Sequence, residues 1–308
     1  MIKPVRKAVF PVAGMGTRFL PATKAVPKEM LTVVDKPIIQ YAMEEAMAAG
    51  IEQFIFVTGR NKSAIDSHFD HAYELESVLQ EKNKNEALAK VTEWMPSPGQ
   101  VFFTRQHAAL GLGHAVWCAR HLVGDEPFAV LLPDDMILSD ESCLKQMLSA
   151  YNQTGGNLVA SEEVSPELTH QYGIIEPHQV KGRLTSAKRF VEKPKPEDAP
   201  SNLAVIGRYV LQPEIFDVLE NQERGAGGEI QLTDAINHMT ANTDTHGFRF
   251  EGERFDCGNR LGFVEANIAY ALKRADMHDR VKDMLVRYQD KAAVPATTPW
   301  KKPAVLAA

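Results

Sequence analysis

The chain has 308 residues, of which 44% are hydrophobic and 24% charged, a balance that is typical of a soluble globular protein and excludes a collagen-like or disordered one. Lys and Arg number 34 against 40 Asp and Glu, and the resulting net charge of -6 argues against a nucleic-acid partner, although a few converging cations can still hold an anionic substrate. No stretch approaches the roughly 20 apolar residues of a membrane-spanning helix, so we expect no membrane partner.

Strand and helix patterns alternate over the first 135 residues. Residues 6–12 predict a buried strand ending in a glycine-rich loop; a signal peptide is disfavoured because Pro11 and Gly14 interrupt the apolar run. Helical spacing and a first-turn proline predict a helix over 35–50. The other expected elements here are strands at 53–59, 101–106 and 127–135 and helices at 61–90 and 113–123. This order predicts a Rossmann-like α/β fold, with a mostly parallel mixed sheet and helices on both faces.

Beyond residue 150 the pattern is mixed. We expect strands at 157–164, 172–177, 183–194 and 202–211, and helices near 213–221, 230–240, 260–275 and 277–289. No repeat and no Pro/Gly/Ser linker divides the chain, so residues 1–290 are predicted to form a single domain with parts at about 1–150 and 151–290. The tail at 291–308 is rich in Ala, Pro and Thr, and we expect it to be disordered.

The three cysteines favour a reducing compartment. Cys118, Cys143 and Cys257 are odd in number and widely spaced, and no CxxC pair occurs. This usage argues against a disulfide framework and against a zinc site. We therefore expect a cytoplasmic protein.

The glycine-rich loop is the most informative stretch, "PVAGMGTRFLPATKAVPKEMLTVVDKP" at 11–37. Gly14 and Gly16 directly follow a predicted strand, where a parallel sheet places its ligand crevice and where glycines let backbone N–H groups approach phosphate. A dinucleotide fingerprint would need glycine at position 19, which is Phe19, and no GxxxxGK[ST] P-loop occurs. Both familiar phosphate motifs are therefore absent in strict form.

Three cations stand beside these glycines within a dozen residues: Arg18, Lys24 and Lys28. The planar fork of arginine suits bridging phosphate oxygens, and lysine acts as a movable point charge. The set suits a triphosphate whose departing pyrophosphate must be stabilised. The plainer alternative is a surface loop with solvated lysines, which would suffice for a lone GxG but not for the whole string.

The loop also carries a family resemblance. "AGxGTRxLPxTKxxPKEML", followed by "DKPxIQY", resembles the signature of the bacterial UTP–glucose-1-phosphate uridylyltransferases (UDP-glucose pyrophosphorylases), a branch of the sugar nucleotidyltransferases, and matching motifs run in order over about 5–275. The resemblance implies Mg²⁺-assisted in-line transfer of the uridylyl group of UTP to α-D-glucose 1-phosphate, giving UDP-glucose and pyrophosphate without a covalent intermediate. It also implies a homodimer or homotetramer, a sugar-binding second half, and a catalytic role for Arg18 and Lys28 on the pyrophosphate.

Gln106 follows a predicted strand, and its amide can offer a donor and an acceptor to the imide edge of a pyrimidine. By resemblance, Gln106 and Gly111 read the uracil; the residues alone equally allow a loop glutamine bonded to nearby backbone. His114 is expected to pack or cap at a helix start rather than act as a base. The resemblance extends nucleotide binding to loop positions, namely Ala13, Gly14, Gly16, Thr17 and Glu29.

Two acids end the apolar run "AVLLPDDMIL", and a third stands in "FDCGN". Carboxylates beside a buried strand are seldom there for packing, and such oxygen ligands suit Mg²⁺. By resemblance, Asp134 and Asp256 hold the metal. Asp135 is left open between orienting the sugar, supporting the metal and capping a helix.

The segments "QYGIIEP", "RFVEKP" and "SNLAVIGRYVL" match the part of the family that binds the hexose phosphate. The resemblance places Gly173, Glu192 and Val205 on sugar hydroxyls, Lys193 on the sugar phosphate and Tyr209 around it. Glu229 is left open between the sugar and a helix N-terminus.

Three alternative functions stay open on the sequence alone. A thymidylyl- or adenylyltransferase would use the same sugar phosphate, and Gln106 alone cannot separate uracil from thymine. A non-catalytic regulatory paralogue would not need both metal acids. A glycosyltransferase would explain "PDD" through an Asp-x-Asp motif, but not the loop at 14–28.

Overall fold

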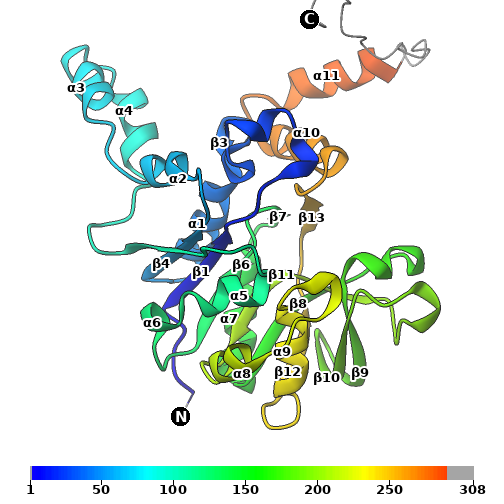
Figure 1. Ribbon diagram of the computed structural model, residues 1–308. Coiled ribbons are helices and arrows are strands. Elements are labelled where there is room, and N and C mark those ends of the chain that lie inside the picture. The colour runs from blue at the N-terminus through cyan, green and yellow to red at the C-terminus, as the bar shows by residue number, and fades with distance from the viewer. Residues whose placement is uncertain (1, 290–308) are drawn as a thin grey trace, which may run out of the picture.

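The computed structural model describes residues 2–289 (Figure 1). The expected disordered tail at 291–308 lies outside these residues. Among the helices of the described part, none combines the length and the apolar character needed to cross a membrane.

A nine-stranded sheet runs through the molecule in the order β5-β4-β1-β6-β11-β8-β12-β10-β9. In its first half β1 pairs in parallel with β4 and β6, and β4 pairs in parallel with β5, as the alternating strand and helix pattern predicts. These strands are short and apolar, and they read as continuous hydrophobic runs because helices cover both faces. Their bounds are Lys7–Val12 for β1, Gln53–Thr58 for β4, Val101–Arg105 for β5 and Phe128–Leu131 for β6.

The second half of the sheet is mainly antiparallel, so the expectation of a mostly parallel sheet holds only for the first half. β11 runs antiparallel to β6 and β8, β10 runs antiparallel to β9 and β12, and only β12 and β8 are parallel. One further pairing, of β9 with β11, closes five strands into a ring. The bounds are Asn157–Glu163 for β8, Gly173–Lys181 for β9, Leu184–Glu192 for β10, Leu203–Leu211 for β11 and Thr245–Arg249 for β12.

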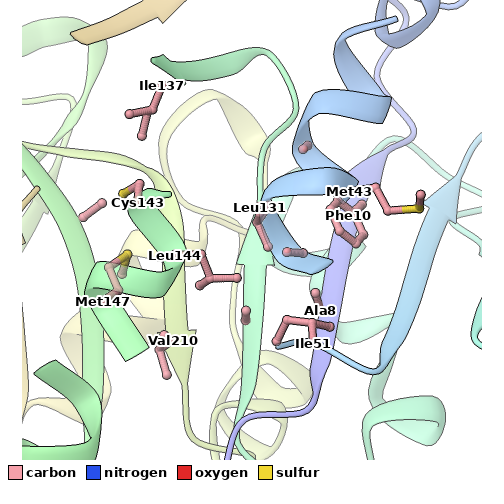
Figure 2. Packing of buried hydrophobic residues seen from close by; sticks show 14 of the residues in the cluster. Ala8, Phe10, Met43, Ile51, Leu131, Ile137, Cys143, Leu144, Met147 and Val210 are labelled. Atoms are coloured by element: carbon pink, nitrogen blue, oxygen red, sulfur yellow. The ribbon is translucent and has the colours of Figure 1, made fainter. Parts of the chain in front are cut away.

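Helices cover both faces of the sheet, as predicted. On one face α1 (Ile38–Ala48) and α7 (Cys143–Thr154) bury their apolar sides against β1, β6 and β11, and Figure 2 shows Met43, Leu144 and Met147 directed at this layer. On the other face α5 (Leu112–Trp117), α8 (Ile215–Asn221) and α9 (Leu232–Met239) pack against the opposite sides of the same strands. A short helix α6 (Arg120–Val123) follows α5, so the predicted helix at 113–123 is broken in two.

The predicted helix at 61–90 is three separate helices: α2 (Ser63–His68), α3 (Tyr73–Glu81) and α4 (Asn85–Thr92). Neither α3 nor α4 buries a residue, and both stand away from the sheet in Figure 1. At the C-terminal side lie α10 (Arg260–Lys273) and α11 (His278–Gln289). The remaining 3₁₀ turns outside the glycine-rich loop are η4 (Pro166–Gln171), η5 (Pro196–Asp198) and η6 (Ala226–Gly228).

A small antiparallel ribbon positions the acids. The strand expected at 127–135 ends at Leu131, and after a turn β7 (Asp135–Leu138) pairs with β13 (Glu253–Asp256). In this register Asp135 lies opposite Asp256, so the ribbon brings together acids that are far apart in the sequence. A second ribbon of β2 (Thr32–Val33) and β3 (Lys36–Pro37) ends the glycine-rich loop.

Candidate active site

The glycine-rich loop leaves β1 and folds through three 3₁₀ turns, η1 (Thr17–Phe19), η2 (Ala22–Lys24) and η3 (Lys28–Met30). Gly16 has a left-handed φ of 65°, and a Cβ there would lie only 3.0 Å from the Cβ of Lys28 and 3.1 Å from a methyl of Thr23. Thr23 donates its hydroxyl to the Gly16 carbonyl at 2.7 Å. Glycine is therefore what allows the loop to close onto Lys28.

Lys28 donates from Nζ to Oδ2 of Asp134 at 2.5 Å. A Cβ placed on Gly258 would lie 2.8 Å from Oδ1 of Asp256, 3.1 Å from the same Asp134 oxygen and 3.5 Å from Nη1 of Arg18. Arg18 also approaches the Gly258 carbonyl, at 3.4 Å. Arg18 from the loop and two acids from the β7–β13 region thus converge on one glycine, and Lys28 joins them through Asp134.

The charges in this crevice support one another. Burial disfavours the charged form of Lys28, but the carboxylates of Asp134 and Glu29 outweigh it and raise the lysine pKa above its ordinary value. Burial likewise opposes ionisation of Asp134, but the neighbouring ammonium brings the pKa of that carboxyl below its ordinary value. Both groups are therefore charged at neutral pH.

Asp256 is held in place by the turn that follows it. Its Oδ1 accepts the Gly258 N–H at 2.8 Å and its Oδ2 accepts from the amide of Asn259 at 2.9 Å. The other amide atom of Asn259 caps helix α10 by accepting from the Gly262 N–H at 2.8 Å. The Cys257 N–H donates to the Asp134 carbonyl at 2.7 Å, which joins the two acidic segments directly.

Asp135 does not cap a helix, so that alternative is wrong: the residue begins β7, and α7 is capped by Ser142. Its Oδ1 pairs with the guanidinium of Arg254, with Nε at 2.7 Å, and its Oδ2 accepts the Gly207 N–H at 2.9 Å. Both oxygens are thus engaged by β13 and β11, and Arg254 further donates to the hydroxyl of Tyr172 at 3.3 Å.

A cavity of about 450 Å³ opens beside the loop, and its lining includes Ala13, Gly14, Lys24, Lys62 and Gln106. The amide nitrogen of Gln106 donates to the Gly111 carbonyl at 3.0 Å and lies 3.0 Å from Nδ1 of His114. Two other loop positions predicted to bind nucleotide, Gly16 and Thr17, follow the lining residue Met15 in the sequence but do not line the cavity themselves.

Glu29 is fully buried and does not line the cavity. Its Oε2 accepts from Nζ of Lys62 at 2.6 Å, and its Oε1 has no hydrogen-bond partner among the described residues. Burial raises the pKa of Glu29 above its ordinary value, although Lys62 and Lys28 oppose the shift. Its role in this arrangement is to hold Lys62 at the wall of the cavity.

Replacing Lys62 by Met is expected to lower the free energy of unfolding by about 3–5 kcal/mol at neutral pH, because it leaves Glu29 buried without its partner. The folded-state pKa of Glu29 then lies still further above the unfolded value, so stability is present at low pH and lost as the pH rises through that pKa. Urea unfolding at pH 7 and at about pH 5 should show a smaller deficit at the lower pH. A deficit independent of pH, or no recovery in a Glu29→Met/Lys62→Met double variant, would contradict the ion-pair explanation.

The sugar-side residues gather where β9, β10 and β11 meet. A Cβ on Gly173 would lie 2.8 Å from the hydroxyl of Thr233 and 3.3 Å from Oε2 of Glu192. Lys193 takes a left-handed φ of 45° and pairs with Oε1 of Glu192 at 3.1 Å. Val205 and Tyr209 lie buried on β11, and burial, with Asp135 and Glu192 nearby, raises the pKa of the tyrosine.

Several residues of the site were not predicted: Lys62, Arg254, Asn259 and Thr233 hold or face predicted ones. Arg254 had a usable signal, because residues two apart on a strand share a face and it precedes Asp256 by two. Of the residues whose role was left open, Lys24 lines the cavity. Glu229 is exposed, and its Oε2 accepts a hydrogen bond from the side-chain amide of Gln231 at 3.3 Å. The Cβ of Glu229 occupies the space that a side chain at Gly111 would need.

Comparison with known proteins shows the family to which the chain belongs. Residues 7–273 match the family model described as nucleotidyl transferase. The chain is 52% identical over 284 residues to UTP–glucose-1-phosphate uridylyltransferase 2 of Staphylococcus saprophyticus, covering 92% of this chain and 98% of that protein. The chain belongs to the UTP–glucose-1-phosphate uridylyltransferase family. Its α/β nucleotidyltransferase fold is that of the UDP-glucose pyrophosphorylases.

Two solved structures illustrate the likeness. The UTP-bound enzyme from Acinetobacter baumannii superposes with a TM-score of 0.85 at 43% identity, over 92% of this chain and 99% of that one. A UDP-glucose pyrophosphorylase complexed with UDP-glucose superposes with a TM-score of 0.79 at 44% identity, over 88% of this chain and 100% of that one. The family predicted from the loop signature is thereby confirmed.

Proposed function

We propose that the crevice around Gly258 is the active site in which the protein transfers the uridylyl group of UTP to α-D-glucose 1-phosphate, giving UDP-glucose and pyrophosphate. The observation that carries this assignment is the convergence of Arg18, Asp134 and Asp256 on that glycine, with Lys28 bound to Asp134. Family membership supplies the reaction, and the geometry supplies the place for it. In this proposal the first half of the single domain binds the nucleotide and the second half binds the sugar phosphate.

The base occupies the cavity of about 450 Å³ beside the loop. Ala13 and Gly14 offer backbone to the flat side of the ring, and Gln106 meets its imide edge. The triphosphate then lies along the loop toward Lys28, whose Nζ is 4.0 Å from the position of a Cβ on Gly14. Glu29 takes part only through Lys62.

A phosphate oxygen of glucose 1-phosphate attacks the α-phosphorus of UTP in line, and pyrophosphate departs from the opposite side. The attacking group is already an anion, so no Ser, Cys or His is needed as a covalent nucleophile. Arg18 and Lys28 stabilise the charge on the departing pyrophosphate, and Lys193 holds the attacking phosphate. Catalysis rests on alignment and on charge neutralisation by preplaced groups.

Asp134 and Asp256 fit a magnesium ion. Mg²⁺ is bound in such sites by one or two carboxylates with substrate phosphates, and both carboxylates face the space that a side chain at Gly258 would fill. Within residues 2–289 no three His, Cys, Asp or Glu side chains gather into a metal cluster. Asp134 and Asp256 would therefore be the protein groups that hold the ion, together with substrate phosphates. When bound, the metal neutralises charge on the reacting phosphates. Asp135 holds this region through Arg254 and Gly207.

The hexose lies where β9, β10 and β11 meet. Glu192 accepts hydrogen bonds from sugar hydroxyls, and the absence of a side chain at Gly173 leaves room beside it. Lys193 exchanges its contact with Glu192 for the sugar phosphate when substrate arrives. Val205 and Tyr209 form the wall on β11.

The test is to incubate the protein with glucose 1-phosphate, Mg²⁺ and each of UTP, dTTP, CTP, ATP and GTP, and to measure pyrophosphate release. UTP should give the highest kcat/KM. A higher value for dTTP would favour the thymidylyltransferase alternative, and no release with any nucleotide would favour the regulatory paralogue. The retained acids and cations speak against the latter.

We further propose a homodimer or homotetramer in the cytoplasm. The oligomer rests on the family resemblance alone, and light scattering of the purified protein tests it. The location rests on the cysteines, which are all free.

A further inference from the structure

The side-chain amide of Gln106 is held in one orientation. Its nitrogen lies 3.0 Å from the carbonyl oxygen of Gly111 and 3.0 Å from Nδ1 of His114. A backbone carbonyl can only accept a hydrogen bond, so it must face the amide nitrogen rather than the amide oxygen. The Gly111 carbonyl therefore favours this orientation of the amide, and Nδ1 of His114 is the second group that holds it.

This orientation fixes the state of the histidine. Because the second amide hydrogen of Gln106 points to His114, Nδ1 must be the acceptor nitrogen, and the ring proton is on Nε2. The thiol of Cys118 lies 3.8 Å from the same nitrogen, and burial raises its pKa, so it remains a donor. Burial, with Arg120 nearby, lowers the pKa of His114 and keeps the ring neutral. The ring is also stacked against Trp117, with centroids 5.7 Å apart.

This arrangement leaves Oε1 of Gln106 available as a hydrogen-bond acceptor for a ligand in the cavity. Both amide hydrogens of Gln106 are used, and in the part of the chain that the structure describes no group donates to its Oε1. Gln106 lines the same cavity as Ala13 and Gly14. The side chain therefore offers an oxygen, and no hydrogen, to a base bound there.

We propose that His114 is a positioning residue for base selection: by accepting from Gln106 it keeps the amide oxygen toward the base, so the site takes uracil and rejects cytosine. Uracil carries a hydrogen on N3 and can donate to this oxygen, whereas cytosine has a lone pair on N3 and would leave two acceptors facing each other. The two rings are nearly the same size, so cavity shape alone cannot separate them, but an unmatched polar pair can. This inference rests on the proposed function, which places the base at Gln106.

The experiment compares kcat/KM for UTP and CTP in wild type, His114→Phe and His114→Asn. Phenylalanine keeps a ring against Trp117 but removes one of the two acceptors that hold the amide. Turning the amide toward CTP then breaks one hydrogen bond instead of two, so the UTP/CTP ratio should fall at least about tenfold. Asparagine can place its oxygen near the position of Nδ1 and should restore most of the ratio. Cys118→Ala removes only the weaker thiol donor and should leave the ratio unchanged.

A ratio in His114→Phe within twofold of wild type, or equal ratios in His114→Phe and His114→Asn, would overturn the proposal. His114→Leu serves as a second variant without the acceptor if His114→Phe does not fold, as judged by circular dichroism. Titration calorimetry of UTP and CTP measures the same discrimination without turnover. If wild type binds both nucleotides with the expected preference but releases no pyrophosphate, the proposed function fails while the role of His114 stands.

Discussion

Replacing Lys28 by alanine is expected to lower kcat by about 10²–10³-fold and to leave the KM for glucose 1-phosphate within a few-fold of wild type. The ammonium lies 2.5 Å from Asp134 in a crevice shared with Arg18, so it is already in place when charge develops on the departing pyrophosphate. An interaction that strengthens in the transition state changes kcat more than it changes binding. Steady-state assay of pyrophosphate release measures both constants.

Lys36→Ala is the matched control. Lys36 also pairs with a carboxylate at 2.5 Å, that of Glu44, but it lies on β3 and outside the crevice. Its loss removes one lysine and one ion pair without touching the proposed site, so kcat should stay near wild type. Equal kcat values in Lys28→Ala and Lys36→Ala would remove Lys28 from the catalytic residues.

The fold could be predicted where the strand signal is local. The run from Phe54 to Val57 is apolar throughout, and it forms β4 as expected. β12 was not predicted, because it has five residues, Gly247 among them, and only one large apolar side chain, Phe248. It becomes a strand through pairing with β8 and β10, partners that come much earlier in the chain. Strand direction in the second half depends on the same distant pairings, which no local pattern encodes.

The site could be predicted as a set of motifs but not as a set of contacts. The loop signature pointed to Lys28 and Glu29 together, yet the structure turns the first into the crevice and buries the second on Lys62. Neighbouring residues of a 3₁₀ turn point about 120° apart, and the sequence does not say which faces the ligand. The partner of Asp135, Arg254, is 119 residues away, so its spacing to Asp256 could mark it as a site residue but could not reveal that it pairs with Asp135.

Asp134→Asn is expected to lower kcat by about 10³-fold and to raise the Mg²⁺ concentration needed for half-maximal rate by at least about 10²-fold. The substitution keeps the shape of the side chain, and therefore the packing at Gly258, while it removes the charge that faces Asp256. Titration of the activity with Mg²⁺, together with Mn²⁺ binding followed by electron paramagnetic resonance, separates lost metal from lost turnover.

Asp140→Asn is the matched control for this change, because Asp140 also pairs with a lysine, Lys273 at 2.8 Å, but on the exposed surface. Its metal dependence should equal that of wild type. Asp134→Asn also leaves Lys28 without its partner, so the double variant Lys28→Ala/Asp134→Asn is needed to apportion the loss. If the two residues act as one unit, the kcat of the double variant should be only slightly below that of the less active single variant. If they act independently, the fold-decreases in kcat of the two single variants should multiply in the double variant.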